Sequence, residues 1–384
     1  MSSDCGFECK KISELKGIGL FATKSYREGE TIFVEDPLVA AQFSWNEAYG
    51  YLACHHCLRP LETVEENVKR LTNNSNIIVP LPKLCSTDQS KHRACELCEI
   101  QFCSDVCKEL AFQQYHNAIC FAKKPSLLGL CEKWKKIHYP PETTSIMLLL
   151  KIIGMVEQAE GNEELMNRFL NFSHGSSDER EGMLLKLFGP ENSEKLKILH
   201  TQLTQSLSVR HAGSLVSEEG MKSLFALIGR NGQGIGTSVF SEWVKVVEKH
   251  EMSNEDKERT DNFIDAVYQA MDEYVGTFLN TEGSGLYETQ RCINHSCSPN
   301  AVVTFPYSNS TLLLQAKTNI EPGDEICISY LDDCQLERSR HSRNKDFRDY
   351  YLFECTCEKC LSQLNDPDVT SEEESEEEVE DMDC

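Results

Sequence analysis

Two spacings of hydrophobic residues divide the chain into strand-like and helical regions. Residues 16–35 combine the apolar run Leu20–Ala22 with the alternation of Ile32 and Val34, which predicts strand, turn and strand. Between about residues 140 and 275, apolar residues recur three and four positions apart, which predicts helices. The three stripes are Ile146, Leu149, Leu150 and Ile153; Met221, Leu224, Phe225 and Ile228; and Phe263, Ile264, Val267 and Met271. We expect the first helix to follow Pro140-Pro141 and the second to end at Gly229.

Past residue 300 the pattern returns to short strands. Residues 301–305 and 312–316 predict a hairpin, and residues 325–330 predict a strand after a turn. Residues 334–348 are highly charged and predict a helix with a solvated face, or else an anchor for an acidic segment. Residues 232–236, GQGIG, lack the preceding strand and the Lys-Ser/Thr pair of a phosphate loop, so we expect a flexible loop there.

Length and cysteine content narrow the class of protein. A chain of 384 residues with 40% hydrophobic residues predicts one large domain or two to three smaller ones. The longest apolar run, residues 146–156, is interrupted by Lys151 and is too short to span a bilayer. The first 30 residues contain no long apolar segment, so we expect no secretory signal. The nineteen cysteines therefore indicate metal ligands and a reducing compartment. We expect a cytoplasmic location and leave open whether part of the protein is nuclear.

The charge of −24 is unevenly distributed. Residues 371–384 carry nine acids and no base, and the segment past Pro367 lacks the apolar content to fold. Such acidity disfavours direct binding of nucleic acid and favours basic protein partners, with simple solubility as the alternative explanation.

Eight cysteine and histidine residues have the spacing of metal ligands. They are Cys54, Cys57, Cys95, Cys98, Cys103, Cys107, His116 and Cys120, and four close pairs fit two tetrahedral zinc sites. A helix starting at Ser104-Asp105 would present Cys107 and His116 from one element. The 37 residues between Cys57 and Cys95 contain Cys85 and His92, either of which could replace a ligand. His55 and His56 are further candidates, with a solvated position as the default reading.

A second polar motif, RCINHSCSPN at residues 291–300, places an amide, an imidazole and a thiol side by side. Pro299 predicts a fixed turn, and the alternative is a polar loop with a buried cysteine. Tyr330 follows at the end of a predicted strand, and Cys355, Cys357 and Cys360 come after it.

This order of motifs, with Gly17-Ile18-Gly19-Leu20 near the start, resembles the SET domain of protein lysine methyltransferases. The cluster between residues 54 and 120, with histidine as the seventh of eight ligands, resembles a MYND zinc module rather than a RING. Together they resemble the SET and MYND domain-containing family. The resemblance implies an α+β fold with small twisted sheets, a knot-like C-terminal threading, a helical insert, and zinc-stabilised MYND and post-SET modules. It also implies three zinc ions. Their ligand sets would be Cys54, Cys57, Cys103 and Cys107; Cys95, Cys98, His116 and Cys120; and Cys297, Cys355, Cys357 and Cys360.

The resemblance also divides the chain into six segments. These are residues 1–53, the first part of the SET domain; 54–120, the MYND-type module with its long insert; 121–280, the helical linker and SET insert; 281–333, the SET core; 334–361, the post-SET zinc segment; and 362–384, a disordered acidic tail.

The implied activity is S-adenosylmethionine-dependent methylation of lysines in basic proteins, such as histone tails or ribosomal proteins. Tyr330 and Tyr351 would be catalytic, although a tyrosine at a strand end is usually core. The cofactor would be bound by Lys16, Gly17, Ile18, Gly19, Leu20, Asn294, His295, Tyr330 and Phe353. A MYND module implies partners with proline-rich motifs. The alternative is a catalytically weak, zinc-dependent scaffold that holds basic partners through this module and the acidic tail.

Overall fold

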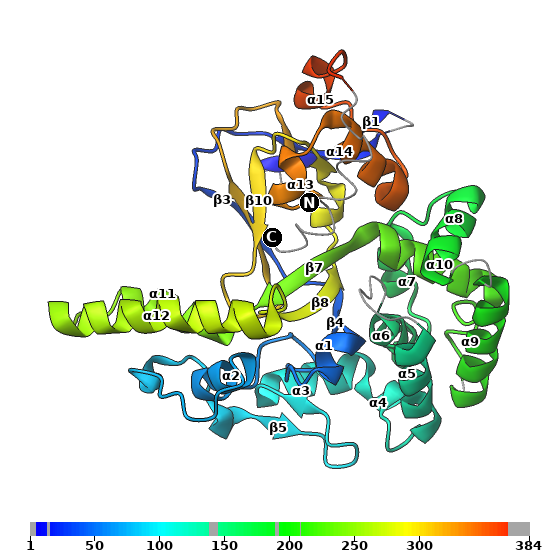
Figure 1. Ribbon diagram of the computed structural model, residues 1–384. Coiled ribbons are helices and arrows are strands. Elements are labelled where there is room, and N and C mark those ends of the chain that lie inside the picture. The colour runs from blue at the N-terminus through cyan, green and yellow to red at the C-terminus, as the bar shows by residue number, and fades with distance from the viewer. Residues whose placement is uncertain (1–4, 14–15, 138–144, 189–191, 208, 368–384) are drawn as a thin grey trace. The chain divides into compact units, whose positions relative to one another are not determined.

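The computed structural model describes residues 5–13, 16–137, 145–188, 192–207 and 209–367 (Figure 1). These residues form two compact units. Unit 1 combines the chain up to Asp36 with Glu288–Pro306 and the chain from Thr311 onward, and unit 2 contains Pro37–Tyr287 with Tyr307–Ser310. The six-segment division stays a prediction. Of the predicted acidic tail, residues 362–367 are described, and residues 368–384 lie outside the described part of the chain.

Unit 1 contains two small sheets. A four-stranded sheet has the order β1-β2-β12-β9, and a three-stranded antiparallel sheet has the order β10-β11-β3. The strands are β1 (Phe7–Ser13), β2 (Gly17–Ala22), β3 (Thr31–Glu35), β9 (Asn294–His295), β10 (Ala301–Thr304), β11 (Leu312–Ala316) and β12 (Glu325–Ile328), with a 3-10 turn η5 (Gln290–Cys292) before β9. The predicted strand–turn–strand and the predicted hairpin are confirmed. The first strand, β1, was not predicted, because its sequence FECKKIS is mostly polar and exposed.

The four-stranded sheet brings distant parts of the chain together. Leu20 of β2 lies opposite Ile326 of β12, and both side chains are fully buried, which fixes the antiparallel register. On the other side of β12, β9 pairs in parallel and sets Cys327 beside Asn294 and Ile328 beside His295. The side chain of Asn300 supports this arrangement, because its amide nitrogen donates to the Glu325 carbonyl and its oxygen accepts from the Cys327 backbone nitrogen.

The C-terminal part of unit 1 contains short helices. They are α13 (Asp333–Glu337), α14 (Arg340–Asp346), the π-helical turn η6 (Phe347–Tyr351) and α15 (Glu358–Ser362). The single helix predicted over residues 334–348 is wrong, because Arg338 has ψ 164° and Ser339 starts a new helix by accepting a hydrogen bond from Ser342. The predicted solvated face is wrong at Arg343, whose side chain is fully buried.

Unit 2 contains a three-stranded antiparallel sheet of order β4-β8-β7, formed by β4 (Val39–Gln42), β7 (Gly232–Thr237) and β8 (Thr281–Leu286). The flexible loop predicted at residues 232–236 is wrong, since this glycine-rich segment pairs with β8 along its whole length. Glycine has low strand propensity, so here tertiary pairing and not local preference decides the structure.

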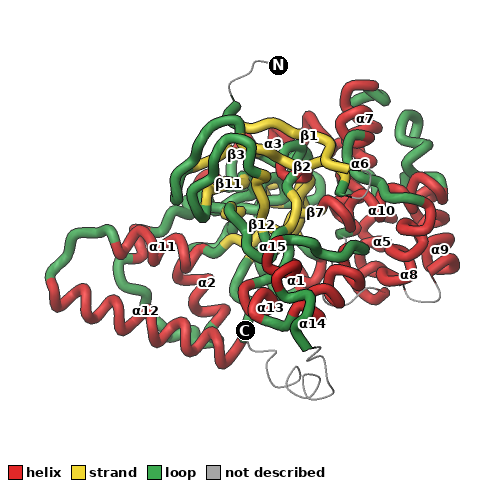
Figure 2. Tube along the Cα trace, turned by 90° about the horizontal axis from the view of Figure 1, so that it is seen from above, coloured by secondary structure: helices red, strands yellow, loops and turns green. Residues whose placement is uncertain are grey.

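Helices make up most of unit 2, and Figure 2 shows α5 to α10 gathered as one group. The helices are α1 (Ser44–Ala48), α2 (Val64–Leu71), α3 (Asp105–Ala111), α4 (Asn117–Ile119), α5 (Pro125–Ile137), α6 (Ile146–Gln158), α7 (Glu163–Leu170), α8 (Ser177–Phe188), α9 (Asn192–Ser206), α10 (Glu218–Asn231), α11 (Val239–Glu248) and α12 (Asn254–Val275). Shorter elements are η1 (Pro82–Leu84), η2 (Gln89–Lys91), β5 (Arg93–Ala94), β6 (Gln101–Phe102) and the π-helical turn η3 (Phe112–His116). Helices α11 and α12 are neighbours, because Phe240 of α11 packs edge-on against Tyr268 of α12.

The three predicted helices are confirmed as α6, α10 and α12, although α10 continues two residues past Gly229. The proline pair expected to precede α6 lies outside the described residues. Helix α6 is apolar on every side, and Ile146 and Leu148–Val156 are buried. No helix among the described residues is both long and apolar enough to cross a membrane.

Lys151 is the single charged side chain within the buried stretch of α6, with 1% of its surface exposed. Its ammonium donates to the Ala40 carbonyl at 2.7 Å and to the His55 carbonyl. The change Lys151→Met should remove both bonds and leave two carbonyl oxygens unsatisfied, lowering the free energy of unfolding by about 1–3 kcal/mol. Denaturant unfolding of the zinc-loaded protein measures this. The control Lys245→Met, on an exposed position of α11, should change stability by less than about 0.5 kcal/mol.

Candidate metal centres and methyl-transfer site

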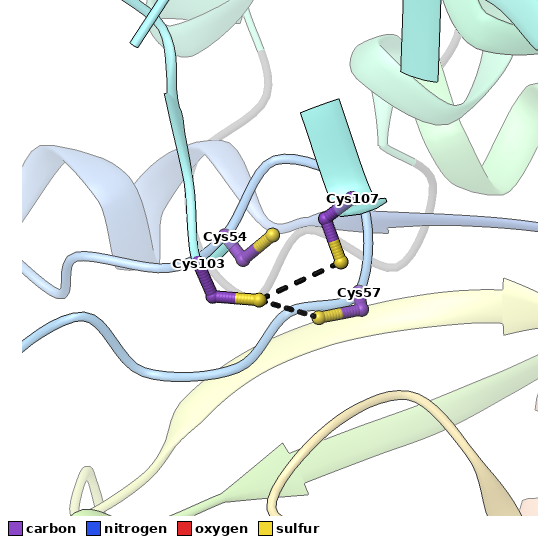
Figure 3. Close-up of side chains that lie close together, drawn as sticks. All are labelled: Cys54, Cys57, Cys103 and Cys107. Atoms are coloured by element: carbon purple, nitrogen blue, oxygen red, sulfur yellow. Dashed lines mark hydrogen bonds between the residues drawn. The ribbon is translucent and has the colours of Figure 1, made fainter. Parts of the chain in front are cut away.

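Twelve cysteine and histidine residues form three groups in which the ligand atoms lie within 4.8 Å of one another. The groups are Cys54, Cys57, Cys103 and Cys107; Cys95, Cys98, His116 and Cys120; and Cys297, Cys355, Cys357 and Cys360. They coincide with the three sets that the resemblance implies. Figure 3 shows the four sulfurs of the first group pointing toward a common centre.

The distances within these groups fit zinc. Four sulfurs placed tetrahedrally about 2.3 Å from a zinc ion lie about 3.8 Å apart. The sulfur of Cys103 lies 3.6 Å from that of Cys57 and 3.5 Å from that of Cys107. In the third group, Cys297 Sγ lies 3.9 Å from Cys355 Sγ and 3.6 Å from Cys360 Sγ.

Two matching turns present the Cys-x-x-Cys pairs of unit 2. In each, the backbone nitrogen four residues after the first cysteine donates to that cysteine's carbonyl, from Leu58 to Cys54 and from Glu99 to Cys95. Leu58 and Glu99 have φ values of 57° and 61°, uncommon for residues other than glycine. This shared backbone positions both sulfurs of a pair toward one ion.

A predicted helix presents two of the remaining ligands of unit 2, Cys107 and His116. Ser104 caps it by accepting from the Cys107 backbone nitrogen, and α3 continues through η3 to His116. His116 Nε2 lies 3.5 Å from Cys98 Sγ.

The four alternative ligands raised from the sequence lie outside the three groups. Cys85 accepts a hydrogen bond from the Val64 backbone nitrogen instead. His55 is not solvated as predicted: its ring packs against Phe102 and Tyr115, and burial lowers its pKa well below the usual value. His56 stacks on Tyr115 at 6.2 Å.

Buried polar side chains surround the third group. Arg343 donates to Cys360 Sγ at 3.6 Å and to Gln363 Oε1 at 2.6 Å. Asn344 accepts from the Cys355 backbone nitrogen at 2.7 Å and lies 3.7 Å from Cys360 Sγ. Four thiolates around one Zn²⁺ carry a net charge of −2, which the buried guanidinium offsets. Neither residue was predicted, because the sequence shows only a charged helix there.

The predicted cofactor-binding pair Asn294 and His295 lies on β9. The Asn294 amide donates to the Ile18 carbonyl at 3.1 Å and to Glu325 Oε1 at 2.8 Å. His295 Nδ1 accepts from the Tyr330 backbone nitrogen at 2.9 Å, so its proton is on Nε2, 3.3 Å from Cys297 Sγ. Burial lowers the pKa of His295 to about 4, which keeps the imidazole neutral.

The predicted aromatic residues gather beside this pair. The Tyr330 hydroxyl donates to the Ile293 carbonyl at 2.7 Å, and the Tyr351 hydroxyl donates to the Tyr330 carbonyl at 2.7 Å. The Phe353 ring stands at 89° to that of Tyr330 and stacks on Phe347. Burial raises the pKa of Tyr330, so its hydroxyl stays protonated and acts as a donor.

The predicted glycine loop forms the start of β2. Gly17 has a φ of +69°, and a Cβ there would meet no atom within 4 Å. Ile18 is 43% exposed, whereas Leu20 is fully buried. Of the expected cofactor contacts on this strand, the Leu20 side chain therefore belongs to the core and only its backbone remains available.

Comparison with known proteins shows which family the chain is similar to. The family model described as "SET domain" matches residues 17–331. Protein-lysine N-trimethyltransferase SMYD5 from Gallus gallus is 47% identical over 378 residues, covering 97% of this chain and 90% of that protein. The Homo sapiens protein of the same name is 46% identical over 371 residues, covering 95% and 89%.

The chain belongs to the SET and MYND domain-containing family. Some relatives match a shorter part of this SET and MYND domain-containing protein. Histone-lysine N-methyltransferase SMYD3 from Mus musculus is 39% identical over 102 residues, which is 26% of this chain and 23% of that protein. A solved structure, "Crystal structure of the SET domain of LSMT bound to Lysine and AdoHcy", has a TM-score of 0.30 and 12% identity, covering 92% of this chain and 54% of that one, and is too distant to bear on the site.

Proposed function

We propose that this protein is an S-adenosylmethionine-dependent protein-lysine N-methyltransferase. The observation that carries the proposal is the network of unit 1 in which the Tyr330 hydroxyl is fixed on the Ile293 carbonyl, directly before Asn294 and His295. Family membership supports it, and so does the activity named for two relatives that align over most of this chain and most of their own. Their names specify trimethylation, and we propose the same product here.

The residues present fit the cofactor. Asn294 and Ile18 are partly exposed and joined by a hydrogen bond, and the open space above Gly17 allows close approach to the backbone. We propose that Lys16, Gly17, Ile18, Gly19 and the Leu20 backbone hold one side of S-adenosylmethionine, with Asn294, His295, Tyr330 and Phe353 on the other. When bound, the cofactor supplies an electrophilic methyl group.

The protein contributes alignment and desolvation. A lysine amine must lose its proton before it can attack, and apolar surroundings lower its pKa. Tyr330 and Tyr351 present protonated hydroxyls and aromatic faces, their ring centroids 5.2 Å apart. We propose that Tyr330 orients the amine and the methyl group, and that Tyr351 lines the lysine channel. Holding reacting groups near contact distance accounts for several kcal/mol of the barrier.

The zinc ions would be structural, since each group offers four protein ligands. The third would tie the NHSC segment to residues 355–360 and so fix Tyr351 and Phe353 beside His295. The knot-like threading of this segment stays a prediction. We further propose basic proteins, such as histone tails or ribosomal proteins, as substrates, because the chain carries a charge of −24. We also propose that the MYND-type module binds proline-rich motifs of partner proteins. The proposed location is the cytoplasm, with part of the protein in the nucleus.

Two measurements test the function. Calorimetry with S-adenosylmethionine should show binding to the zinc-loaded protein, and mass spectrometry of a treated cell extract should show lysines gaining three methyl groups. Cofactor binding without any transfer would favour the scaffold alternative, and absence of cofactor binding would overturn the proposal.

The change His295→Leu should weaken cofactor binding itself. Leucine cannot accept the bond from the Tyr330 backbone nitrogen, so the turn after β12 loses its support. We expect the dissociation constant of S-adenosylmethionine to rise about tenfold or more, measured by calorimetry. The control His250→Leu, at an exposed position of unit 2, should leave it unchanged. Equal affinities in both variants would contradict the assigned role.

A further inference from the structure

Two cysteines outside the three metal groups lie next to each other in unit 1. Cys9 is exposed on β1, the edge strand of the four-stranded sheet. It stands opposite the fully buried Leu20 of β2, and residues directly opposite in an antiparallel pair share a face, so Cys9 extends the buried face to the edge of the sheet. The turn η5 packs against β2 and ends at Cys292, which is 3% exposed. An accessible thiol and a buried thiol, both free, therefore interact at this edge.

The turn that presents Cys292 is held in place by Glu35. The Glu35 carboxylate accepts hydrogen bonds from the backbone nitrogens of Thr289 at 2.7 Å and Gln290 at 3.0 Å, where η5 begins. The position of the buried thiol beside Cys9 is therefore set by the fold and not by a loose loop.

The two thiols differ in protonation. The hydrogen bond with Cys292, and after it the positive charge of Arg291, lower the pKa of the Cys9 thiol to about 7. Burial and the Glu35 carboxylate act in the opposite direction without reversing the shift. The same contact raises the pKa of Cys292, which keeps its proton. At pH 7 about half of Cys9 is then thiolate, against about 3% of an ordinary thiol, and the thiolate is the nucleophile.

Both cysteines border the proposed cofactor site. Strand β1 pairs with β2, which carries the proposed cofactor contacts of residues 17–20. Cys292 directly precedes Ile293, whose carbonyl accepts the Tyr330 hydroxyl at 2.7 Å. A disulfide bond holds its sulfurs about 2.05 Å apart, closer than two unbonded sulfurs can approach, so its formation must move β1 or η5. Either movement reaches groups that the proposed methyl transfer uses.

An accessible thiolate beside a protonated, buried thiol is the arrangement of a reactive and a resolving cysteine. We propose that Cys9 and Cys292 form a disulfide bond when the protein meets a peroxide, and that this bond lowers methyl transfer. The disulfide itself stands on unit 1 alone, and its effect on methyl transfer rests on the proposed function.

The reaction with hydrogen peroxide has two steps. The Cys9 thiolate attacks one peroxide oxygen, so that an S–O bond forms, the O–O bond breaks and hydroxide leaves with the electron pair. The Cys292 sulfur then attacks the Cys9 sulfur, so that the S–S bond forms, the S–O bond breaks and the oxygen leaves as water with the Cys292 proton. The two sulfurs together lose two electrons, and the peroxide is reduced to water once the hydroxide takes up a proton.

Disulfide mapping of the zinc-loaded full chain tests the pair. After treatment with hydrogen peroxide at pH 7, free thiols are blocked, the chain is digested, and fragmentation of linked peptides assigns the bonded cysteines. We expect a Cys9–Cys292 link in the unaltered protein and in the matched control Cys5→Ser, which removes another exposed cysteine near the N-terminus. Cys9→Ser should lack the link. Elemental analysis of the same samples should return an unchanged zinc content, which shows that the metal ligands were not oxidised.

Methyl transfer by the same samples measures the consequence. In the unaltered protein the rate should fall about tenfold or more as the link forms, because reacting groups are displaced, and should recover after reduction with glutathione. Cys9→Ser should keep its rate at the same peroxide concentration. Absence of the link, a Cys5–Cys9 link in its place, or full transfer by the linked protein would overturn the inference. A link that forms in a protein that transfers no methyl group even when reduced would refute the proposed function and leave the disulfide standing.

Discussion

Replacing Tyr330 with phenylalanine is expected to lower the rate of methyl transfer about 10²–10³-fold while leaving the fold intact. The hydroxyl is the only group removed, and it is held on the Ile293 carbonyl by a 2.7 Å hydrogen bond. The aromatic contacts with His295 and Tyr351 remain available to phenylalanine. Single-turnover kinetics followed by mass spectrometry measure the chemical step, and calorimetry should give an affinity for S-adenosylmethionine near that of the unaltered protein.

Tyr307→Phe is the matched control, since Tyr307 is 46% exposed and belongs to unit 2. It should transfer methyl groups at the normal rate. A Tyr330→Phe variant as fast as this control would show that Tyr330 packs in the core and does not act in transfer.

Replacing Cys297 with alanine should remove one zinc ion of three and unfold the C-terminal part of unit 1. Structural zinc contributes about 10–16 kcal/mol in small zinc modules, which exceeds the stability of most domains. The core of this region consists of the ligands Cys297, Cys355 and Cys360 with Leu331, Leu336 and Phe347, and it contains little else to hold it together. Elemental analysis should return two ions per chain, and methyl transfer should be lost.

Cys334→Ala provides the control, because Cys334 is exposed and lies outside the three ligand groups. It should retain three ions and full activity. Two or fewer zinc ions in the unaltered protein would refute at least one of the three proposed sites. Normal zinc content in Cys297→Ala would show that this cysteine is not a ligand.

Local patterns predicted local structure well. The stripe beginning at Ile146 predicted helix α6, which is buried on nearly every side and not on one face alone. The alternation at Ile32 and Val34 predicted strand β3, in which Ile32 is buried and Val34 is 48% exposed. Segments whose structure depends on distant partners were missed. Strand β7 has three glycines and no strand signal of its own, and its conformation comes from pairing with β8, about 45 residues later. Helix α14 was merged with α13, because the break at Arg338 leaves no Gly or Pro in the sequence.

The candidate site shows the same division. Cysteine and histidine spacing predicted two zinc sites, and the family resemblance implied the three ligand sets that the structure also brings together. The partners of these ligands, such as Arg343, come from residues whose type is common on surfaces, so sequence alone could not select them. The roles of Tyr330, Tyr351 and Phe353 stay proposals.

The pairing of β2 with β12 has a consequence for biosynthesis. About 300 residues separate the two strands, and ribosomes add roughly 5–20 residues per second, so β2 must wait about 15–60 s for its partner. During that interval the apolar segment around Leu20 is exposed as an unpaired strand edge, which invites aggregation. The intervening residues, which include all of unit 2, can fold while β2 waits. A nascent chain of this protein should therefore depend on chaperones until residue 328 has left the ribosome.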